Sequence, residues 1–361
     1  MKKLALFSLI LGCCLWTTAV RAQDKNLDIP DAYTYSLDSL AFYIDSHCNE
    51  DTTKLRALYD WMVGHMHYNV YPTFVSVNQK RDEAKEIALA LRSREGVCRH
   101  FARIFQEVSE RMAIPAFFIE GYTKSNGAII PDPHAWCAAL VNGKWYLYDP
   151  TYGMGYVRNY KFVSSPNSNY CQVEPDKFIS SHMPFDPIWQ LLERPYTFQA
   201  FDQGLEPPAD RPPFSYADSI RVHLQRKPVE QLTAVNERIR RNGTPNRLVS
   251  YCLEVNTANI AVRRHNEVYE IYKTALTHYN SCVDHYNALV RYRRTHDKVS
   301  RSDRRQVSEW IADAAADIAE ASQTLQTADQ VPEQYATAID NLKTAIAELT
   351  EKVERKKEEM L

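Results

Sequence analysis

One stretch of the chain decides the fold: residues 133–150 read PHAWCAALVNGKWYLYDP. Two runs rich in apolar and aromatic residues flank the dipeptide Asn142-Gly143. This dipeptide between two such runs predicts a β-hairpin closed by a two-residue turn, because both residues tolerate the positive φ that the turn requires. The stretch therefore predicts two antiparallel strands.

The turn also fixes which residues of the hairpin face each other. If Asn142 and Gly143 form the loop, the numbers of opposed residues add up to 285, as 142 and 143 do. Trp136 then lies opposite Asp149. His134 shares a face of its strand with Trp136, so Asp149 is a diagonal neighbour of His134 on that face. The register thus predicts a carboxylate within reach of an imidazole.

A cysteine upstream stands at the predicted start of a helix. Residues 94–102 read REGVCRHFA. Cys98 is followed by apolar residues at helical spacing, namely Phe101, Ile104, Phe105, Val108 and Met112. Because a helix N-terminus carries partial positive charge and free N–H groups, it favours thiolate over thiol and can donate to an oxyanion. Cys98 is therefore predicted to be a nucleophile.

Cys98, His134 and Asp149 are the residue types of a nucleophilic triad in its thiol form. The cysteine attacks, the histidine takes its proton and the carboxylate orients the imidazole ring. Each residue also has a plainer interpretation. A lone cysteine is more often buried and structural, and Asp149 before Pro150 can simply initiate a turn. The combination of helix start and hairpin register favours the triad.

At these residues the chain resembles the transglutaminase-like superfamily of papain-related thiol enzymes. The resemblance rests on Gly96-Val97-Cys98, His134-Ala135-Trp136 and Trp145 to Thr151, preceded by Tyr59 to Val63 and Tyr68-Asn69. It runs from about Leu55 to Tyr156 in the family's order. The resemblance implies a papain-like core in which Cys98, His134 and Asp149 are catalytic.

Three further residues are candidates for the oxyanion site or the cleft. The family's aromatic at the place of Tyr68 implies an oxyanion-site role for Tyr68, although core packing explains this residue equally well. Bacterial members usually carry a small residue where this chain has His100, which leaves the shape of the cleft open. We interpret His100 as a helix-surface or cleft-edge residue. Trp136 is interpreted as hairpin packing rather than as a substrate platform.

The chain up to residue 203 predicts an α+β catalytic domain, spanning 23–203. Helices are predicted over 36–46, 53–67, 80–92 and 98–112, and a strand over 116–122 precedes the hairpin. Helices first and antiparallel strands afterwards are typical of this class. Residues 183–201 are rich in aromatic residues and proline, and they predict an extension packed on the same domain.

The C-terminal part predicts an all-α coiled-coil bundle over 215–361. Residues 204–214 contain four prolines and predict a semi-rigid linker. Beyond them, apolar residues recur every seven positions at Leu248, Val255, Val262, Tyr269, Leu276, Val283 and Val290, with Ala258, His265, Tyr272, Tyr279 and Tyr286 as the second seam. Shorter repeats follow over 307–325 and 339–353. Three helices, the first about 50 residues and ~75 Å long, are expected to fold back on each other.

This bundle is expected to fold apart from the catalytic domain. We predict that it serves as a spacer, as a docking site for a protein partner or as a surface for self-association. Truncation near Pro208 is accordingly expected to leave Cys98 reactive.

The first 22 residues predict an export signal. Lys2 and Lys3 precede an apolar run, and Val20-Arg21-Ala22 offers small residues for cleavage. The protein is thus expected to be exported, to the periplasm or the extracellular space, with no transmembrane helix in the mature chain. The alternative is a lipoprotein site at Ile10 to Cys13, with the chain anchored through a lipid on Cys13.

Composition limits which partners and cofactors the chain is predicted to bind. The formal net charge of −2 gives no support for nucleic-acid binding. No CxxC pair occurs, and His134 and Cys137 point to opposite faces of one strand, so neither a metal site nor a cofactor is predicted. Six cysteines in so long a mature chain do not make a disulfide framework.

The sequence therefore predicts an exported thiol enzyme that acts on amide bonds of peptides or proteins through an acyl-enzyme. If water accepts the acyl group, the protein is a peptidase or amidase. If a lysine amine accepts it, the protein is a cross-linking transglutaminase. Hydrolysis is favoured, because cross-linking requires the exclusion of water from an open cleft. A third interpretation is a non-catalytic transglutaminase-like binding module, against which an intact triad argues.

Overall fold

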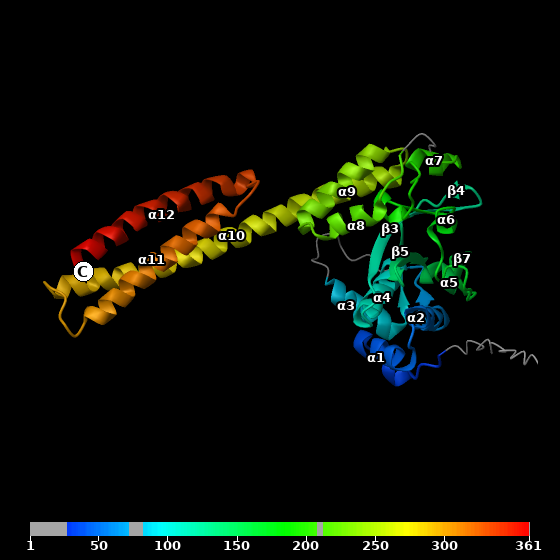
Figure 1. Ribbon diagram of the computed structural model, residues 1–361, viewed down its shortest axis with the longest axis horizontal. Helices are drawn as coiled ribbons and strands as arrows, with labels where there is room; N and C mark the ends of the chain where they lie inside the picture. Colours follow the sequence, from blue (N-terminus) through cyan, green and yellow to red (C-terminus); the bar gives the residue numbers. More distant parts are fainter. Residues whose placement is uncertain (1–26, 72–81, 208–211, 361) are drawn as a thin grey trace, which may run out of the picture. The chain divides into compact units, whose positions relative to one another are not determined.

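The computed structural model describes residues 27–71, 82–207 and 212–360. The predicted export signal over 1–22 and the alternative lipid site at Cys13 lie outside these residues. The described chain mixes helices with an antiparallel sheet and ends in long helices, which confirms the predicted α+β class (Figure 1). It divides into two compact units. Unit 1 comprises Met1–Phe118 and Trp136–Val173, and unit 2 comprises Ile119–Ala135 and Glu174–Leu361.

Unit 1 holds the helices that were predicted ahead of the hairpin. Its elements are η1 (Asp31–Tyr33), α1 (Leu37–His47), α2 (Asp51–His65), β1 (His67–Tyr68), α3 (Glu83–Ser93), β2 (Glu95–Gly96), α4 (Cys98–Arg111), the start of β3 (Ala116–Ser125), most of β5 (His134–Val141), β6 (Lys144–Tyr148), α5 (Pro150–Met154), β7 (Gly155–Arg158) and β8 (Lys161–Ser164). Helix α4 is central, because α1, α2, α3 and α5 all contact it.

The apolar face of α4 lies in the core of unit 1. Phe101, Ile104, Phe105 and Val108 are fully buried, which confirms the predicted amphipathic helix. The ring of Phe105 lies 4.9 Å, centroid to centroid, from the ring of Tyr148 on β6. The helix that carries the predicted nucleophile is thus packed directly against the hairpin.

The hairpin has the predicted turn and register. Asn142 has φ 51° and Gly143 has φ 77°, so both residues of the loop adopt the left-handed conformation of a type I′ turn. Val141 pairs with Lys144 and Cys137 pairs with Tyr148. These are the pairs whose numbers add up to 285.

Unit 2 contains the remaining strands and all the later helices. Its elements are the rest of β3, β4 (Ala128–Ile129), α6 (Pro175–Phe178), β9 (His182–Pro184), η2 (Pro187–Gln190), α7 (Phe198–Gln203), α8 (Tyr216–Leu224), α9 (Pro228–Asn242), α10 (Arg247–Thr295), α11 (Arg304–Gln326) and α12 (Glu333–Met360). The strand order is β4-β3-β5-β6, and β9 pairs antiparallel with β3.

A single core in unit 2 joins residues from both sides of the predicted linker. Tyr122, Phe185 and Phe198 pack in one cluster with Ile239 of α9 and Val249 of α10. Residues on both sides of the 204–214 segment thus share one core, and the predicted domain boundary stays a prediction. Apolar residues on α9 and at the start of α10 cover the side chains that precede the linker, and burying both sets removes more apolar surface from water than two separate cores would.

A buried ion pair crosses the same boundary. Arg238 of α9 donates from Nε and Nη2 to the Asp186 carboxylate, at 2.7 and 2.6 Å. The His223 ring of α8 lies beside Arg238, with Nδ1 3.2 Å from Nη2. Burial lowers the pKa of His223, and its effect exceeds that of the Asp186 charge, which raises this pKa. Helices α8 and α9 are thus tied to the segment that carries η2.

The long helix α10 has the predicted length, and the predicted seam residues Tyr272, Leu276, Tyr279, Val283 and Tyr286 pack against the bundle core, partly buried. Its fully buried residues are shifted from that seam. It spans 49 residues. Val268, Ala275, Cys282 and Leu289 are its buried positions in the bundle, one residue before the predicted series Tyr269, Leu276, Val283 and Val290. Two helices, α11 and α12, share a core with α10. The fully buried residues of α10 therefore lie between the face that contacts α11 and the face that contacts α12, rather than along one seam. Upstream, Val255 and Val262 are exposed.

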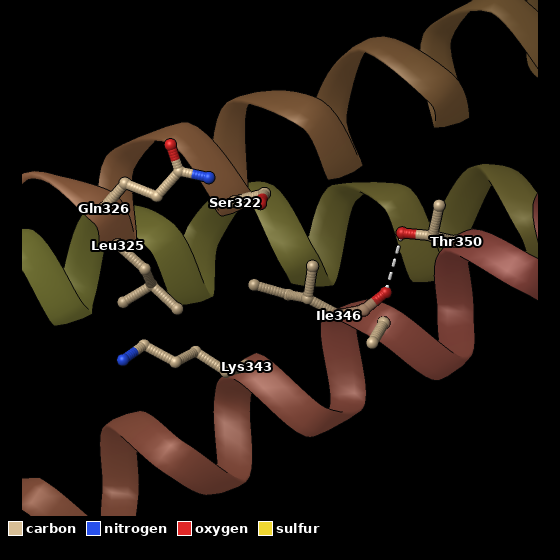
Figure 2. A pocket seen from close by; sticks show the side chains of 7 residues that line it. Ser322, Leu325, Gln326, Lys343, Ile346 and Thr350 are labelled. Carbon is tan, nitrogen blue, oxygen red and sulfur yellow. Dashed lines mark hydrogen bonds between the residues drawn. The ribbon is translucent and has the colours of Figure 1, made fainter.

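A cleft of about 410 Å³ lies between α11 and α12 (Figure 2). Leu325 and Ile346 form its apolar part, and Gln326, Lys343 and Thr350 are among its polar residues. Lys343 is the one ionisable side chain among these lining residues. Among the described helices, none is both long and apolar enough to cross a membrane.

Candidate thiol active site

Cys98 is the first residue of α4, as predicted. Val97 is the N-cap in extended conformation, with φ −120° and ψ 173°. The Cys98 side chain is half-buried. The first N–H groups of a helix have no partner within the helix, so the turn that carries Cys98 presents donors where an oxyanion would form.

His100 caps the helix start that carries Cys98. The Val97 N–H donates to Nδ1 of His100 at 3.1 Å, which is the half of a capping box that the third helical residue supplies, since the valine side chain has no acceptor. The other ring nitrogen, Nε2, lies 3.8 Å from Oε2 of Glu86, which also pairs with Arg99. His100 is therefore a local support of the nucleophile turn, which agrees with the helix-surface interpretation more than with a cleft edge.

The absence of a side chain at Gly96 leaves space for the imidazole ring of His100. A Cβ on Gly96 would lie 3.1 Å from Cβ and Nδ1 of His100 and 3.2 Å from Phe101. The glycine thus makes room for the imidazole against the backbone.

Replacing His100 tests this capping role. We expect His100→Ala to lower the free energy of unfolding by about 1 kcal/mol, as the loss of a helix cap does. We expect His100→Gln to retain most of the stability, because glutamine at the same position of a capping box accepts from the N-cap N–H. Urea denaturation of the three proteins measures both effects. Equal stability of His100→Ala and wild type would show that the cap contributes nothing.

Tyr68 is held beside the nucleophile turn by a pairing that the sequence did not predict. Strand β1 pairs in parallel with β2, with Tyr68 opposite Gly96. The Asn69 N–H donates to the Gly96 carbonyl at 2.7 Å. The half-buried Tyr68 ring lies 6.4 Å from the ring of Phe101. Its place beside Gly96 suits either a wall of the oxyanion site or core packing.

Asp149 is fully buried and caps a short helix. Its Oδ1 accepts the Tyr152 N–H at 3.1 Å at the start of α5, so the plainer interpretation, an Asp-Pro turn, is present in the structure. The Asp149 N–H donates to the Tyr170 carbonyl at 2.9 Å. Since a carboxylate has a second oxygen, the cap is compatible with orientation of an imidazole. Burial and, after it, the Asp149 charge raise the pKa of Tyr170.

His134 begins strand β5 in unit 2 and is buried, with 8% of its surface exposed. Trp136, two residues on, is 1% exposed, which supports packing of the hairpin rather than a substrate platform. The confirmed register is the one from which the diagonal placement of His134 and Asp149 follows. The meeting of Cys98, His134 and Asp149 in one triad stays a prediction.

A second histidine lies beside His134. The ring of His182, on β9, is 5.9 Å from the ring of His134, centroid to centroid. His182 is 1% exposed. No sequence motif pointed to it, because it stands in the aromatic stretch near residue 183 and meets His134 only through the pairing of β9 with β3.

The other cysteines of the described chain are poor nucleophiles. All six described cysteines are free thiols. Burial raises the pKa of Cys48 and Cys137, and it raises the pKa of Cys171 and Cys252 to about 12 and that of Cys282 to about 11. Because the thiolate is the nucleophile, these five side chains are held in the unreactive form at neutral pH.

Residues 38–150 match the model of the Transglutaminase-like superfamily. The chain therefore contains a transglutaminase-like domain at these residues, which confirms the resemblance. The match includes Cys98, His134 and Asp149.

Among curated proteins, the kyphoscoliosis peptidases of Homo sapiens and Mus musculus are each 27% identical over 177 residues. The match covers 47% of this chain and 26% of those relatives, so the chain spans about a quarter of their length. Among solved structures, the periplasmic domain of TgpA from Pseudomonas aeruginosa is 24% identical with a TM-score of 0.27, covering 35% of this chain and 46% of that one. A structure described as a TGase is 16% identical with a TM-score of 0.26, covering 39% and 37%.

Proposed function

We propose that this protein is a thiol enzyme that cleaves amide bonds of peptides or proteins, with Cys98 as nucleophile, His134 as acid and base, and Asp149 as the group that orients His134. The observation that carries the proposal is the place of Cys98. It is half-buried and is the first residue of α4, where the helix N-terminus favours a thiolate and offers N–H donors. The transglutaminase-like domain over 38–150 and the likeness to a peptidase support it.

The proposed reaction has two steps. His134 takes the Cys98 proton, and the thiolate forms a bond to the amide carbonyl carbon while N–H groups at the start of α4 stabilise the oxyanion. The carbon–nitrogen bond then breaks, and His134 returns the proton to the leaving amine. In the second step an acceptor attacks the thioester, Cys98 leaves as thiolate, and His134 takes the acceptor's proton.

The acceptor separates the two activities. We favour water, since cross-linking requires that water be kept from the acyl-enzyme while an amine enters. The proposal therefore names a peptidase or amidase, and a cross-linking transglutaminase is the competing outcome. Export through the predicted signal over 1–22 remains part of the proposal.

Incubation with a glutamine-containing peptide, with and without a primary amine, tests the proposal by mass spectrometry. We expect a new free carboxylate, at the side chain or at a cleaved backbone bond, in both reactions. A product that contains the amine would assign transamidation instead. Cys98→Ala is the control and should give neither product. Products that persist in this variant would exclude Cys98 as the nucleophile.

A further inference from the structure

The middle of helix α10 lies between two cores of unit 2. Val249 belongs to the core that also holds Ile239 of α9, and Val268 belongs to the core that α10 shares with α11 and α12. From Ser250 to Glu267, all within the described chain, no residue of the helix is buried. About five turns of α10 therefore have no buried face.

This part of α10 nevertheless carries apolar side chains at the spacing of a helix–helix contact. Tyr251, Val255, Val262 and Tyr269 are 38–58% exposed, and Ala258 between them is exposed as well. We call these five residues the exposed seam. The same heptad spacing continues downstream into residues that pack against the bundle core. Because apolar residues at this spacing pack along a second helix, the exposed seam indicates a further helix on this face.

The helix α12 covers α10 only beyond the exposed seam. Tyr335, in the first turn of α12, has its ring 5.2 Å from the ring of His265 and 6.5 Å from the ring of Tyr269, centroid to centroid. Met360, at the other end of α12, shares a cluster with Leu289. α12 thus runs from the level of His265 toward the C-terminal end of α10, and a helix for the exposed seam has to come from elsewhere.

The exposed seam is complementary to itself when two copies of α10 run antiparallel. With Ala258 opposite Val262 of the second copy, Val255 lies opposite His265, and the two tyrosines at the ends of the seam lie opposite each other. The central layers then combine a small residue with a larger one, which fills the space between the helices. A parallel pairing places Ala258 on Ala258, which leaves a gap, and it places His265 on His265.

The antiparallel pairing also brings opposite charges together. Glu254 and Arg264 lie on the same flank of the exposed seam. In this pairing Glu254 of each copy is only about 3 Å along the helix axis from the level of Arg264 of the other, whereas a parallel pairing separates these levels by about 15 Å. The flanking positions Asn259, Ala261 and Asn266 are uncharged, so they bring no like charges together.

We propose that residues 251–269 of α10 pair antiparallel with the same residues of a second copy of this chain. A fully buried aromatic side chain removes about 150–250 Å² from water, so a half-exposed tyrosine has roughly 100 Å² left to bury. The two seams together offer on the order of 700 Å², which is less than the roughly 1,200 Å² of a stable complex. The dimer is therefore reversible, with a dissociation constant on the order of 10 µM. This inference does not depend on the proposed function.

Sedimentation equilibrium of the full chain under reducing conditions tests the pairing, at concentrations from about 1 to about 200 µM. We expect the wild type to change from monomer to dimer across this range. Val262→Glu places a carboxylate in the seam, and we expect it to raise the dissociation constant at least about tenfold. Arg263→Glu places the same side chain outside the seam, and we expect a dissociation constant within about twofold of wild type. Both positions are exposed, so circular dichroism should show unchanged folding.

An exchange of charges tests the direction of the pairing. Glu254→Arg and Arg264→Glu each place like charges across the antiparallel contact, and we expect each variant alone to have a dissociation constant about threefold higher than wild type. In an equal mixture, one variant supplies both arginines and the other both glutamates. We therefore expect the mixture to dimerise within about twofold of wild type.

Three outcomes overturn the inference. The first is a wild type that stays monomeric at the highest concentration. The second is a Val262→Glu variant that dimerises like the wild type, which would place the contact elsewhere. The third is a mixture that dimerises no more tightly than the two charge variants alone, because the antiparallel pairing requires their charges to meet.

Discussion

Cys98→Ala is expected to abolish amide cleavage and to remove nearly all labelling of the folded protein by a thiol-directed probe at neutral pH. The physical reason is the contrast among the described cysteines. Desolvation raises the pKa of Cys171 and of Cys252 to about 12, so very little of either thiol is thiolate at pH 7. Cys98 stands at the start of a helix, a position that those thiols do not have.

The matched control is Cys252→Ala, which removes a thiol on α10 outside the predicted site. We expect it to retain activity and labelling. Mass spectrometry of the digested protein locates the label, and urea added to the wild type should make all six described cysteines reactive. Equal labelling of several cysteines in the folded protein, or activity retained in Cys98→Ala, would refute the assignment of the nucleophile.

Truncation at Pro207 is the second change with a large expected effect, and we expect it to abolish cooperative unfolding. It removes Ile239 and Val249 from the unit 2 core, which leaves Tyr122, Phe185 and Phe198 uncovered. The burial of each lost side chain is worth about 1.5–3 kcal/mol, and a whole domain is stable by only about 5–15 kcal/mol. Asp186 loses both hydrogen bonds from Arg238 in addition.

A chain that ends at Arg264 is the matched control. It keeps α8, α9 and the part of α10 that packs on α9, and it removes the bundle core formed by α11, α12 and the later part of α10. We expect this chain to melt cooperatively near the wild-type temperature, as followed by circular dichroism. If the chain that ends at Pro207 melts as cooperatively as the longer one, the core across the linker is dispensable and the predicted boundary is restored.

Local patterns predicted most of the elements that surround the candidate site. Asn142-Gly143 fixed the hairpin, since a two-residue turn with two positive φ values allows one register, and the register of Cys137 with Tyr148 followed. The apolar spacing after Cys98 fixed both the start and the buried face of α4. In each case neighbours within a few residues determine the conformation.

Features that depend on the fit of side chains or on distant segments were missed or misplaced. His100 was assigned to a helix surface or cleft edge, but its role as a cap depends on Gly96 leaving room for the ring. The long repeat of α10 predicted a helix of the right length. Which face it buries depends on where α11 and α12 lie, and heptad spacing on one helix does not contain that information.

The sequence by itself determined the hairpin, the nucleophile helix and the resemblance to transglutaminase-like enzymes, because turn geometry, helical period and short motifs are properties of contiguous residues. Only the tertiary structure decided that residues on both sides of the 204–214 segment share one core and that His182 lies beside His134. Both depend on pairing and packing between segments that are 40 or more residues apart in the chain, such as β9 against β3 and α9 against Phe185. Burial of the combined apolar surface selects these arrangements, and no local pattern encodes them.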